Sequence, residues 1–295
     1  MRTLINKSIR GILLVQGLAF TAFAQNTPSF TQYMNNLTPF NTAYSSLDEA
    51  GNANLVARKQ FVGIDDAPST FLFNGSMPIK SIKGTAGIII RNDNMKPENL
   101  TDLNAFFSKS VQISSKSFFA TSVSVGFRNY KVDNVDASDP SFTNSPNTDN
   151  KANVGLGVMI YSNNYYVGAS LPRFNLSKAD RENKYYTNMY YLTAGYLKQL
   201  GADFKIKPAA LLAYTDNIPA QLDLSTTFYV KDTYGLGVNY RSNNELSFIA
   251  SLVANSNLQV GYSYQFGFGE GQINNATHEV TLGYRFGKKL LPKFL

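Results

Sequence analysis

The chain has 295 residues, a formal net charge of +7, 18 Tyr, 21 Phe and neither Cys nor Trp. The lack of cysteine excludes disulfide bonds and thiolate metal sites. The modest basic charge, with no dense run of Lys or Arg, argues against a nucleic-acid-binding role.

The first 24 residues have the pattern of a secretory signal peptide. A start with three basic residues precedes the apolar run GILLVQGLAF, and the small-x-small triplet Ala22-Phe23-Ala24 follows. The apolar run is too short to span a bilayer comfortably, and no later window holds 18 consecutive apolar residues. The sequence therefore predicts a leader, residues 1–24, that is removed after export.

Residues 25–53 are polar and aromatic and differ from everything that follows. The stretch FTQYMNNLTPFNTAYS (30–45) has no charged residue, lacks clean alternation and is interrupted by Pro39. It is too polar for a membrane helix and too aromatic for a simple linker. We expect a periplasmic segment that plugs or caps the following domain by folding into or across its mouth.

Between residues 54 and 287, period-two alternation recurs in segment after segment. In LQVGYSYQFGF (258–268), apolar and aromatic residues alternate with Gln, Gly and Ser, and HEVTLGYRF and YGLGVNYR repeat the pattern. An antiparallel sandwich alternates in the same way, but segments of about nine to eleven residues match a tilted bilayer crossing. Tyr and Phe gather at segment ends, as in an aromatic girdle. The sequence predicts an all-β fold, a transmembrane outer-membrane β-barrel of about 14 antiparallel strands in contact with outer-membrane lipid.

The links between the expected strands alternate in length. KSIK, SSKS and LGAD are short, whereas NDNMKPENL (92–100), 133–150, 172–186 and EGQINNAT (270–277) are longer. Two of the expected outer links, IDDAP and SNNE, are short as well. This alternation predicts periplasmic turns and outer loops if the N-terminus is periplasmic.

Pro208 makes the ninth strand the least regular, because proline is tolerated only near the start of a strand or at a bulge. A basic tail, residues 288–295, follows the last strand. The expected strand centres are Val56, Phe73, Ile89, Phe106, Val123, Val158, Val167, Leu192, Leu211, Leu224, Val238, Phe248, Tyr262 and Leu282.

Charged residues on the polar face are expected inside the lumen. They are Arg128, Asp223, Arg241, Glu279 and Arg285. The arginines have Asp223 and Glu279 as expected partners. A lattice of ion pairs that fills the barrel is preferred to an ion-selective pore. The neighbours Arg58 and Lys59 must point to opposite faces of the first strand, so one of them lies at the membrane interface.

Catalytic and metal sites are not expected. The sole histidine, His278, begins the last segment, and no nucleophile motif accompanies it. The acidic pairs Asp48-Glu49 and Asp65-Asp66 are interpreted as solvated carboxylates, with a calcium site as the alternative. The sequence predicts no enzyme activity and no cofactor.

Several segments resemble the PorP/SprF family. TQYMNNLTPFNTAYS is similar to that family's opening signature, roughly SQYMFNPLxxNPAYAG, and RKQFVGIDDAPSTF is similar to RxQWxGxxGAPxT. Later segments such as NVGLGVMIYSNNYYVGASLPRF follow in the family's order. Thr42, Ser46 and Phe61 depart from the family pattern. The positions that carry the signature are Gln32, Tyr33, Met34, Ala43, Tyr44, Arg58, Gln60 and Pro68.

The resemblance implies an outer-membrane barrel of Bacteroidota that serves the type IX secretion system. Members of the family accompany the export or surface attachment of adhesins, including gliding adhesins, that carry a C-terminal signal domain. The expected function is therefore binding of such a C-terminal domain, which supports export of the adhesin or anchors it. Some members associate instead with periplasmic parts of the secretion motor, and a plugged transporter for an apolar solute is a further alternative. The expected contact residues in the outer loops are Asn134, Asp136, Asp139, Phe142, Arg173, Phe174, Arg181 and Tyr185.

Overall fold

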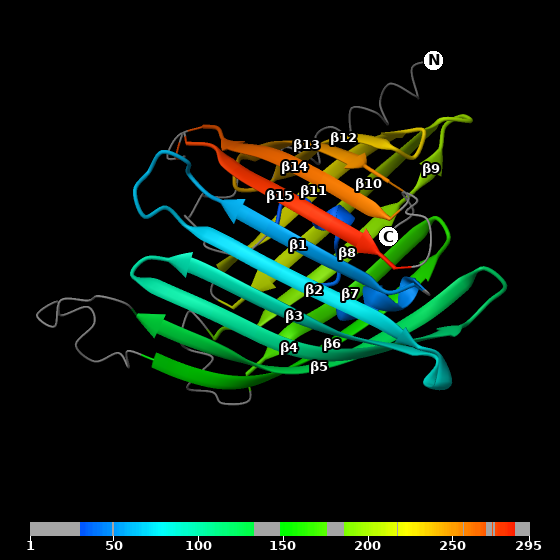
Figure 1. Cartoon of the computed structure of the whole chain (residues 1–295), viewed down its shortest axis with the longest axis horizontal. Coiled ribbons are helices and arrows are strands. Elements are labelled where there is room, and N and C mark those ends of the chain that lie inside the picture. The colour runs from blue at the N-terminus through cyan, green and yellow to red at the C-terminus, as the bar shows by residue number, and fades with distance from the viewer. Residues whose placement is uncertain are drawn as a thin grey trace, which may run out of the picture.

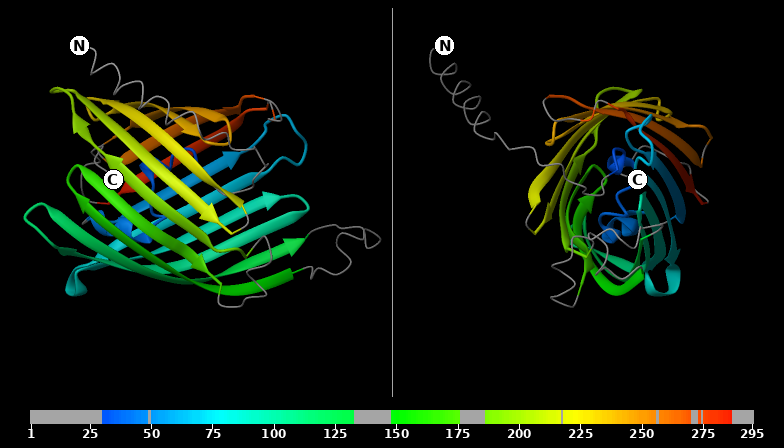
Figure 2. Two further views of the ribbon diagram at one scale, coloured as in Figure 1. Left: turned by 180° about the vertical axis from the view of Figure 1, so that it is seen from behind. Right: turned by 90° about the vertical axis from the view of Figure 1, so that its left-hand side faces the viewer.

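The chain forms one closed antiparallel sheet, seen in a computed structural model (Figures 1 and 2). The structure describes residues 30–48, 50–132, 148–175, 186–216, 218–255, 257–269, 273 and 275–286. β1 pairs with β15, and β10 pairs with β11, so the sheet has no free edge. β8 and β9 occupy a single place beside β10, which gives a barrel of 14 strands. The predicted fold class is confirmed.

Each predicted strand centre lies inside a different strand. The elements are η1 (Tyr33–Asn35), η2 (Thr42–Leu47), β1 (Asn52–Lys59), β2 (Ser69–Ile79), η3 (Lys80–Ile82), β3 (Gly84–Met95), β4 (Glu98–Gln112), β5 (Ser117–Val132), β6 (Thr148–Ser162), β7 (Tyr165–Phe174), β8 (Met189–Tyr196), β9 (Lys198–Gln199), β10 (Phe204–Thr215), β11 (Ile218–Val230), β12 (Tyr234–Arg241), β13 (Glu245–Val253), β14 (Leu258–Gly267) and β15 (Thr277–Arg285). Among the described residues, no helix is long and apolar enough to cross a membrane.

The barrel is apolar outside and polar inside. Outward side chains such as Val167 and Leu236 are 58% and 65% exposed, whereas inward ones such as Asn239 and Ser263 are 1% exposed. Because successive side chains of a strand point to opposite faces, the alternation in the sequence maps directly onto these two surfaces. An apolar outer band with a polar interior is the arrangement of a barrel that contacts lipid.

The hairpin between β3 and β4 corrects one prediction. Residues 92–100 were expected to form an outer loop, but β3 continues to Met95 and β4 begins at Glu98. The outward side chain of Asn92 donates hydrogen bonds to the side-chain oxygens of Asn99 (2.9 Å) and Thr101 (2.8 Å) across the hairpin. Polar pairs of this kind hold the strands together where the outer face is no longer apolar, so hydropathy gives no sign of the strand there. For the same reason β4, β5 and β6, with 15, 16 and 15 residues, exceed the predicted length.

Pro208 coincides with the break between β8 and β9. On that side of β10, pairing with β8 begins at Ala209, and pairing with β9 covers only Lys205 and Ile206. On its other side, Pro208 pairs in register with Thr226 of β11. Proline has no N–H to donate to a neighbouring strand, which explains why the ladder is interrupted at this point.

Candidate functional site: the filled lumen

Residues 30–48, the luminal segment, lie inside the barrel. The right-hand view of Figure 2 shows them, in blue, within the ring of strands. We call the end of the barrel with the short links 80–83, 113–116 and 163–164 the turn end, and the opposite end the loop end. The segment passes from Glu279, near the loop end, to Arg285, at the turn end, where Asp48 pairs with the Arg285 guanidinium. It therefore runs along the interior and does not lie across one mouth.

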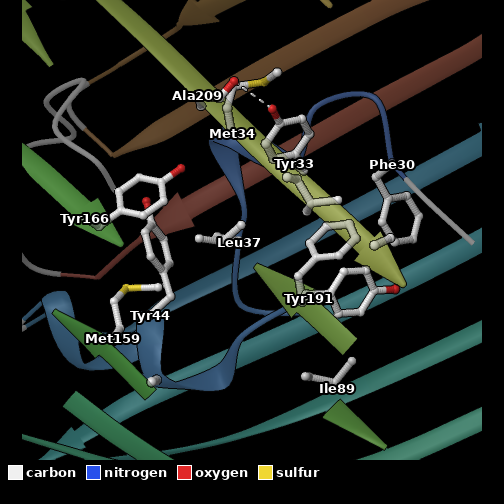
Figure 3. Packing of buried hydrophobic residues seen from close by; sticks show 14 of the residues in the cluster. Phe30, Tyr33, Met34, Leu37, Tyr44, Ile89, Met159, Tyr166, Tyr191 and Ala209 are labelled. Carbon is white, nitrogen blue, oxygen red and sulfur yellow. Dashed lines mark hydrogen bonds between the residues drawn. The ribbon is translucent and has the colours of Figure 1, made fainter. Parts of the chain in front are cut away.

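Apolar side chains of the luminal segment form the centre of the protein's hydrophobic core. Phe40 packs edge-on against Tyr191 of β8 with ring centroids 5.3 Å apart. Tyr44 packs in the same way against Tyr166 of β7 at 5.8 Å (Figure 3). Tyr33, Leu37 and Ala43 are 0% exposed, Met34 is 1% and Phe40 and Tyr44 are 3%. Among the described residues, the segment thus contributes seven of the 21 buried residues of this core, and inward side chains of the strands contribute the others.

Glycines of the barrel wall make room for the polar side chains of this segment. Asn41 caps η2 by accepting a hydrogen bond from the Ala43 N–H at 3.1 Å, and its Nδ2 donates to the Val158 carbonyl at 3.1 Å. A Cβ on Gly157 would lie 2.3 Å from Asn41 Oδ1. A Cβ on Gly261 would lie 2.2 Å from the Gln32 side-chain oxygen. The small residues on the inward face are therefore complementary to the luminal segment.

One buried carboxylate holds the beginning of the luminal segment. Glu279 of β15 accepts hydrogen bonds from the backbone N–H groups of Thr31 and Gln32, each at 2.9 Å, and from Arg58 Nη1 at 3.2 Å. Arg58 of β1 also donates to Gln265 of β14 at 2.9 Å. Bonds to ionised groups are the stronger kind, so the anchor of the segment is a buried ion pair between β1 and β15, extended by the Gln265 amide of β14.

The Tyr33 hydroxyl reaches the wall on the opposite strands. It donates to the carbonyl of Ala209 at 3.1 Å and lies 3.2 Å from the Ser225 hydroxyl. Burial raises the pKa of Tyr33 and of Tyr44 far above the ordinary value of a phenol, so both hydroxyls are neutral at physiological pH. Lys207 of β10 donates to the Met34 carbonyl at 2.7 Å on the same side.

Two groups of ion pairs lie in the half of the lumen nearer the loop end. In the first, Arg241 donates two bonds to Asp223 (2.8 and 3.0 Å) and one to Glu245 (2.9 Å). In the second, Asp102 accepts a bond from Arg128 at 2.6 Å and pairs with Arg173 at 3.4 Å. Beside the second group, Arg91 pairs with Asp93 at 2.6 Å.

The predicted lumen charges all point inward, but the structure assigns some of them different partners. Arg241 pairs with Asp223. Glu279 pairs with Arg58, whereas Arg285 pairs with Asp48 and Arg128 pairs with Asp102. The sequence interpretation missed Asp102 because the β4 segment lacked a clear pattern. The interpretation of Asp48 as a solvated carboxylate is wrong, because Asp48 is buried and pairs with Arg285, a partner that sequence position before the first strand does not reveal. Lys59, as the neighbour of Arg58, is outward and donates to the Ala67 carbonyl at 2.6 Å.

The residues of the family signature lie mainly in the interior. Gln32, Tyr33, Met34, Ala43, Tyr44 and Arg58 are all buried. Gln60 and Pro68 join the two ends of the β1–β2 link, because the Gln60 N–H donates to the Pro68 carbonyl at 2.9 Å. Among the departures from the signature, the Thr42 hydroxyl donates to Ser122 at 2.8 Å. These residues therefore hold the luminal segment in place and do not form an external surface.

The predicted loop contacts are only partly described. Arg173 and Phe174 belong to β7, and Arg173 points into the lumen. Next to them, Tyr186 is 1% exposed and packs with Leu100, Tyr130 and Val132 in an apolar cluster at the loop end. Asn134, Asp136, Asp139, Phe142, Arg181 and Tyr185 lie outside the described residues, as do the predicted leader and the basic tail.

The remaining candidates have structural partners. His278 lies on the outer face, with Nδ1 2.6 Å from the Tyr262 hydroxyl and its ring against Tyr264. Asp66 pairs with Lys96 at 2.8 Å, and Glu49 is outside the described residues. Within the described part of the chain, no group of three or more His, Cys, Asp or Glu side chains is placed to hold a metal ion.

Comparison with known proteins shows the family. The model of the type IX secretion system membrane protein PorP/SprF matches residues 22–284. The chain belongs to the PorP/SprF family. This PorP/SprF chain is therefore an outer-membrane component of type IX secretion. Comparison with curated proteins gives no match.

Solved structures share the fold of this PorP/SprF chain. Omp33 of Acinetobacter baumannii has a TM-score of 0.51 and 10% identity over 81% of this chain and 99% of that one. The toluene transporter TbuX of Ralstonia pickettii has a TM-score of 0.51 and 9% identity, over 88% of this chain and 94% of that one. CymD, a monoaromatic hydrocarbon channel, has a TM-score of 0.51 and 11% identity over 88% and 93%. At these identities the likeness is one of fold alone.

The outer face of the PorP/SprF barrel gives a direct test of its contact with lipid. Val238 lies on the outward face of β12 and is 46% exposed. Val238→Arg is expected to destabilise the folded barrel in lipid bilayers by about 2–4 kcal/mol, because a charge near the bilayer midplane is desolvated. Urea titration in lipid vesicles measures this loss. Asn239→Arg is not a suitable comparison because that side chain is buried, so Val238→Thr serves as the control with a small expected loss.

Proposed function

We propose that this chain binds the C-terminal domain of a secreted, adhesin-like surface protein and supports its export or anchors it at the outer membrane. Family membership over residues 22–284 supports a role in type IX secretion. The filled lumen is the observation that favours binding over conduction. A polypeptide or solute cannot pass where the luminal segment contacts the wall from Glu279 to Arg285.

The cavities inside the barrel support this reading. Within the described part of the chain, three cavities between the luminal segment and the wall measure about 20, 50 and 60 Å³. Pockets for small organic ligands are commonly ~300–1,000 Å³. The plugged transporter for an apolar solute is thus the less favoured alternative, and we infer a binding role without catalysis.

The loop end is our proposed contact surface. It carries the two longest links, residues 133–147 and 175–188, whereas the turn end has short links. Loops on a rigid scaffold commonly carry binding functions. Tyr186, near the end of the second link, packs against Leu100, Tyr130 and Val132 of the barrel wall. With the loop end outside the cell, these links face an exported protein.

Affinity purification in mild detergent tests the proposed function. The intact barrel is expected to copurify with a surface protein that bears a large C-terminal domain, identified by mass spectrometry. Replacing residues 134–147 and 176–185 with short Gly/Ser links is expected to lower this recovery at least about tenfold, since a few contacts dominate most interfaces.

The control replaces residues 80–83 at the turn end in the same way. If cargo recovery stays equal in the loop variant and the control, the loop end is not the contact surface. Recovery of periplasmic motor proteins in place of a surface protein, with loss in the turn variant alone, would favour the motor-linked alternative.

A further inference from the structure

Two neighbouring hairpins carry exposed lysines at the turn end. The β2–β3 hairpin holds Lys80 and Lys83 in its link, and the β4–β5 hairpin holds Lys109 and Lys116. The strands β2, β3, β4 and β5 are consecutive in the sheet, and Figure 1 shows both hairpin ends at the right-hand end of the barrel. The four positive charges therefore lie in one sector of the turn end.

The strands of this sector bring no negative charge to balance the lysines. Residues 67–92 and 103–132 contain neither Asp nor Glu, and they include all of β2 and β5 and most of β3 and β4. Within the described part of the chain, none of the four ammonium groups has a carboxylate partner. In another sector of the turn end, by contrast, Lys205 pairs with Asp232 at 2.6 Å. A partner for the four lysines must therefore come from outside these strands.

Exposed apolar side chains accompany these lysines on the outer surface. They are Met77, Ile79, Ile82, Val111 and Ile113, with exposures of 38–63%. Along the outward face of β4, Lys109 lies between Phe107 and Val111, because alternate residues of a strand share a face. We call the four lysines and these five apolar residues the lysine patch.

The β4–β5 hairpin carries the patch beyond the neighbouring strand. Pairing of β3 with β4 stops at Thr85 and Ser108, whereas β4 continues to Gln112 in its pairing with β5. Val111 and Ile113, near the tip of this projection, are 52% and 54% exposed. Apolar side chains that alternate with lysines suit the boundary between acyl chains and headgroups, because a lysine there keeps its charged end in the polar layer.

The position and the charge of the patch select the kind of partner. The patch is continuous with the apolar outer band of the barrel, so its neighbours are lipid molecules. A zwitterionic headgroup carries its own cation beside the phosphate, whereas an anionic glycerophospholipid such as phosphatidylglycerol does not. An acidic protein would match the lysines but not the apolar side chains beside them. An anionic phospholipid matches both.

We propose that the lysine patch binds anionic phospholipids of the leaflet next to the turn end. Its ammonium groups donate to the phosphate oxygens, and the acyl chains lie against Met77, Phe107 and Val111. Charges of both signs meet at the loop end, as in the exposed pair of Asp66 and Lys96. The preference therefore belongs to one end of the barrel and fixes its orientation and depth in the membrane. The proposal is independent of any surface-protein partner.

Quenching of a single tryptophan by brominated lipids tests this surface. The chain has no Trp, so Val111→Trp places one reporter within the patch of the intact barrel, reconstituted in vesicles of phosphatidylcholine and phosphatidylglycerol. Quenching by brominated phosphatidylglycerol is expected to give an association constant at least about fivefold above that of brominated phosphatidylcholine, the effect of roughly one lysine near an anionic surface. High salt is expected to remove this preference, because it screens exposed charges.

Substitution of the lysines separates their charge from the shape of the surface. Lys80→Gln/Lys83→Gln/Lys109→Gln/Lys116→Gln, combined with the Val111→Trp reporter, is expected to bring the two association constants close to equality. Arginine at the same four positions keeps the positive charge, so that variant is expected to keep the preference for phosphatidylglycerol.

Tyr234→Trp is the matched control reporter. Tyr234 begins β12 at the turn end and is 57% exposed, in the sector where Lys205 pairs with Asp232. Both lipids are expected to quench this reporter equally. The proposal is overturned by equal quenching in the Val111→Trp protein, by a preference that survives the four Gln substitutions, or by the same preference at both reporters. Equal quenching, together with a protein that copurifies with the barrel but not with the Gln variant, would assign the lysines to an acidic protein instead.

Discussion

Deletion of the luminal segment, residues 30–48, is expected to turn a closed barrel into a conducting one. The segment fills the interior with seven buried apolar side chains, from Phe30 to Tyr44. Without it, the inward face exposes Gly, Ser, Thr, Asn and paired charges, which water can hydrate, beside apolar side chains such as Leu72, Met159 and Leu211. Barrels of 16–18 strands enclose aqueous channels and those of about eight are filled by their own side chains. A barrel of 14 strands lies between these cases, so its segment decides whether it conducts.

Single-channel recordings in planar bilayers measure the effect. We expect conductance to rise at least about tenfold, given the lumen width of barrels of this size. Deletion of residues 288–295, which shortens the chain but leaves the luminal segment in place, is the control and is expected to stay closed. Unchanged conductance of the properly folded deletion variant would show that the wall closes the lumen without the segment.

Glu279→Gln is expected to cause the largest loss of stability of any conservative single substitution in the lumen. Glu279 is 1% exposed and balances Arg58, which is 5% exposed. Removing one partner of a buried pair costs about 3–5 kcal/mol, because the remaining charge stays desolvated. The same change weakens the bonds from the Thr31 and Gln32 N–H groups, so the beginning of the luminal segment loosens too.

Urea unfolding of the refolded barrel in lipid vesicles measures this loss. The double variant Arg58→Gln/Glu279→Gln is expected to lose less stability than the sum of the losses in the two single variants. Each single variant leaves one buried charge without its partner, whereas the double variant leaves no such charge. Asp66→Asn, which breaks the exposed pair with Lys96, is the control and is expected to change stability little. Additive losses in the cycle would mean that Arg58 and Glu279 act separately.

A closed lumen has a consequence for secretion by this family member. The barrel itself does not provide a path for an exported chain, so a contribution to secretion must come from its surfaces. Its 14 strands, with no free edge, form a rigid support for the links at both ends. This is the physical basis for proposing a docking role at the loop end.

The sequence by itself determined the strands of the barrel and which way their side chains point. Alternation such as Leu236 against Asn239 is a local property, because the geometry of a strand sends successive side chains to opposite faces. The pattern disappears where both faces are polar, which is why the β3–β4 hairpin at residues 92–100 was predicted as a loop. The break at Pro208 follows from its missing N–H, and that position was recognised as irregular from sequence.

Only the tertiary structure decided what fills the lumen and which charges meet. Glu279 and Arg58 are 221 residues apart, and Asp48 and Arg285 are 237 apart. Nothing local in the sequence specifies these pairs, since they depend on closure of the sheet between β1 and β15. The path of residues 30–48 is equally non-local. Asn41 fits because Gly157 and Gly168 face it from two different strands, and such complementarity exists only once the barrel has closed around the segment.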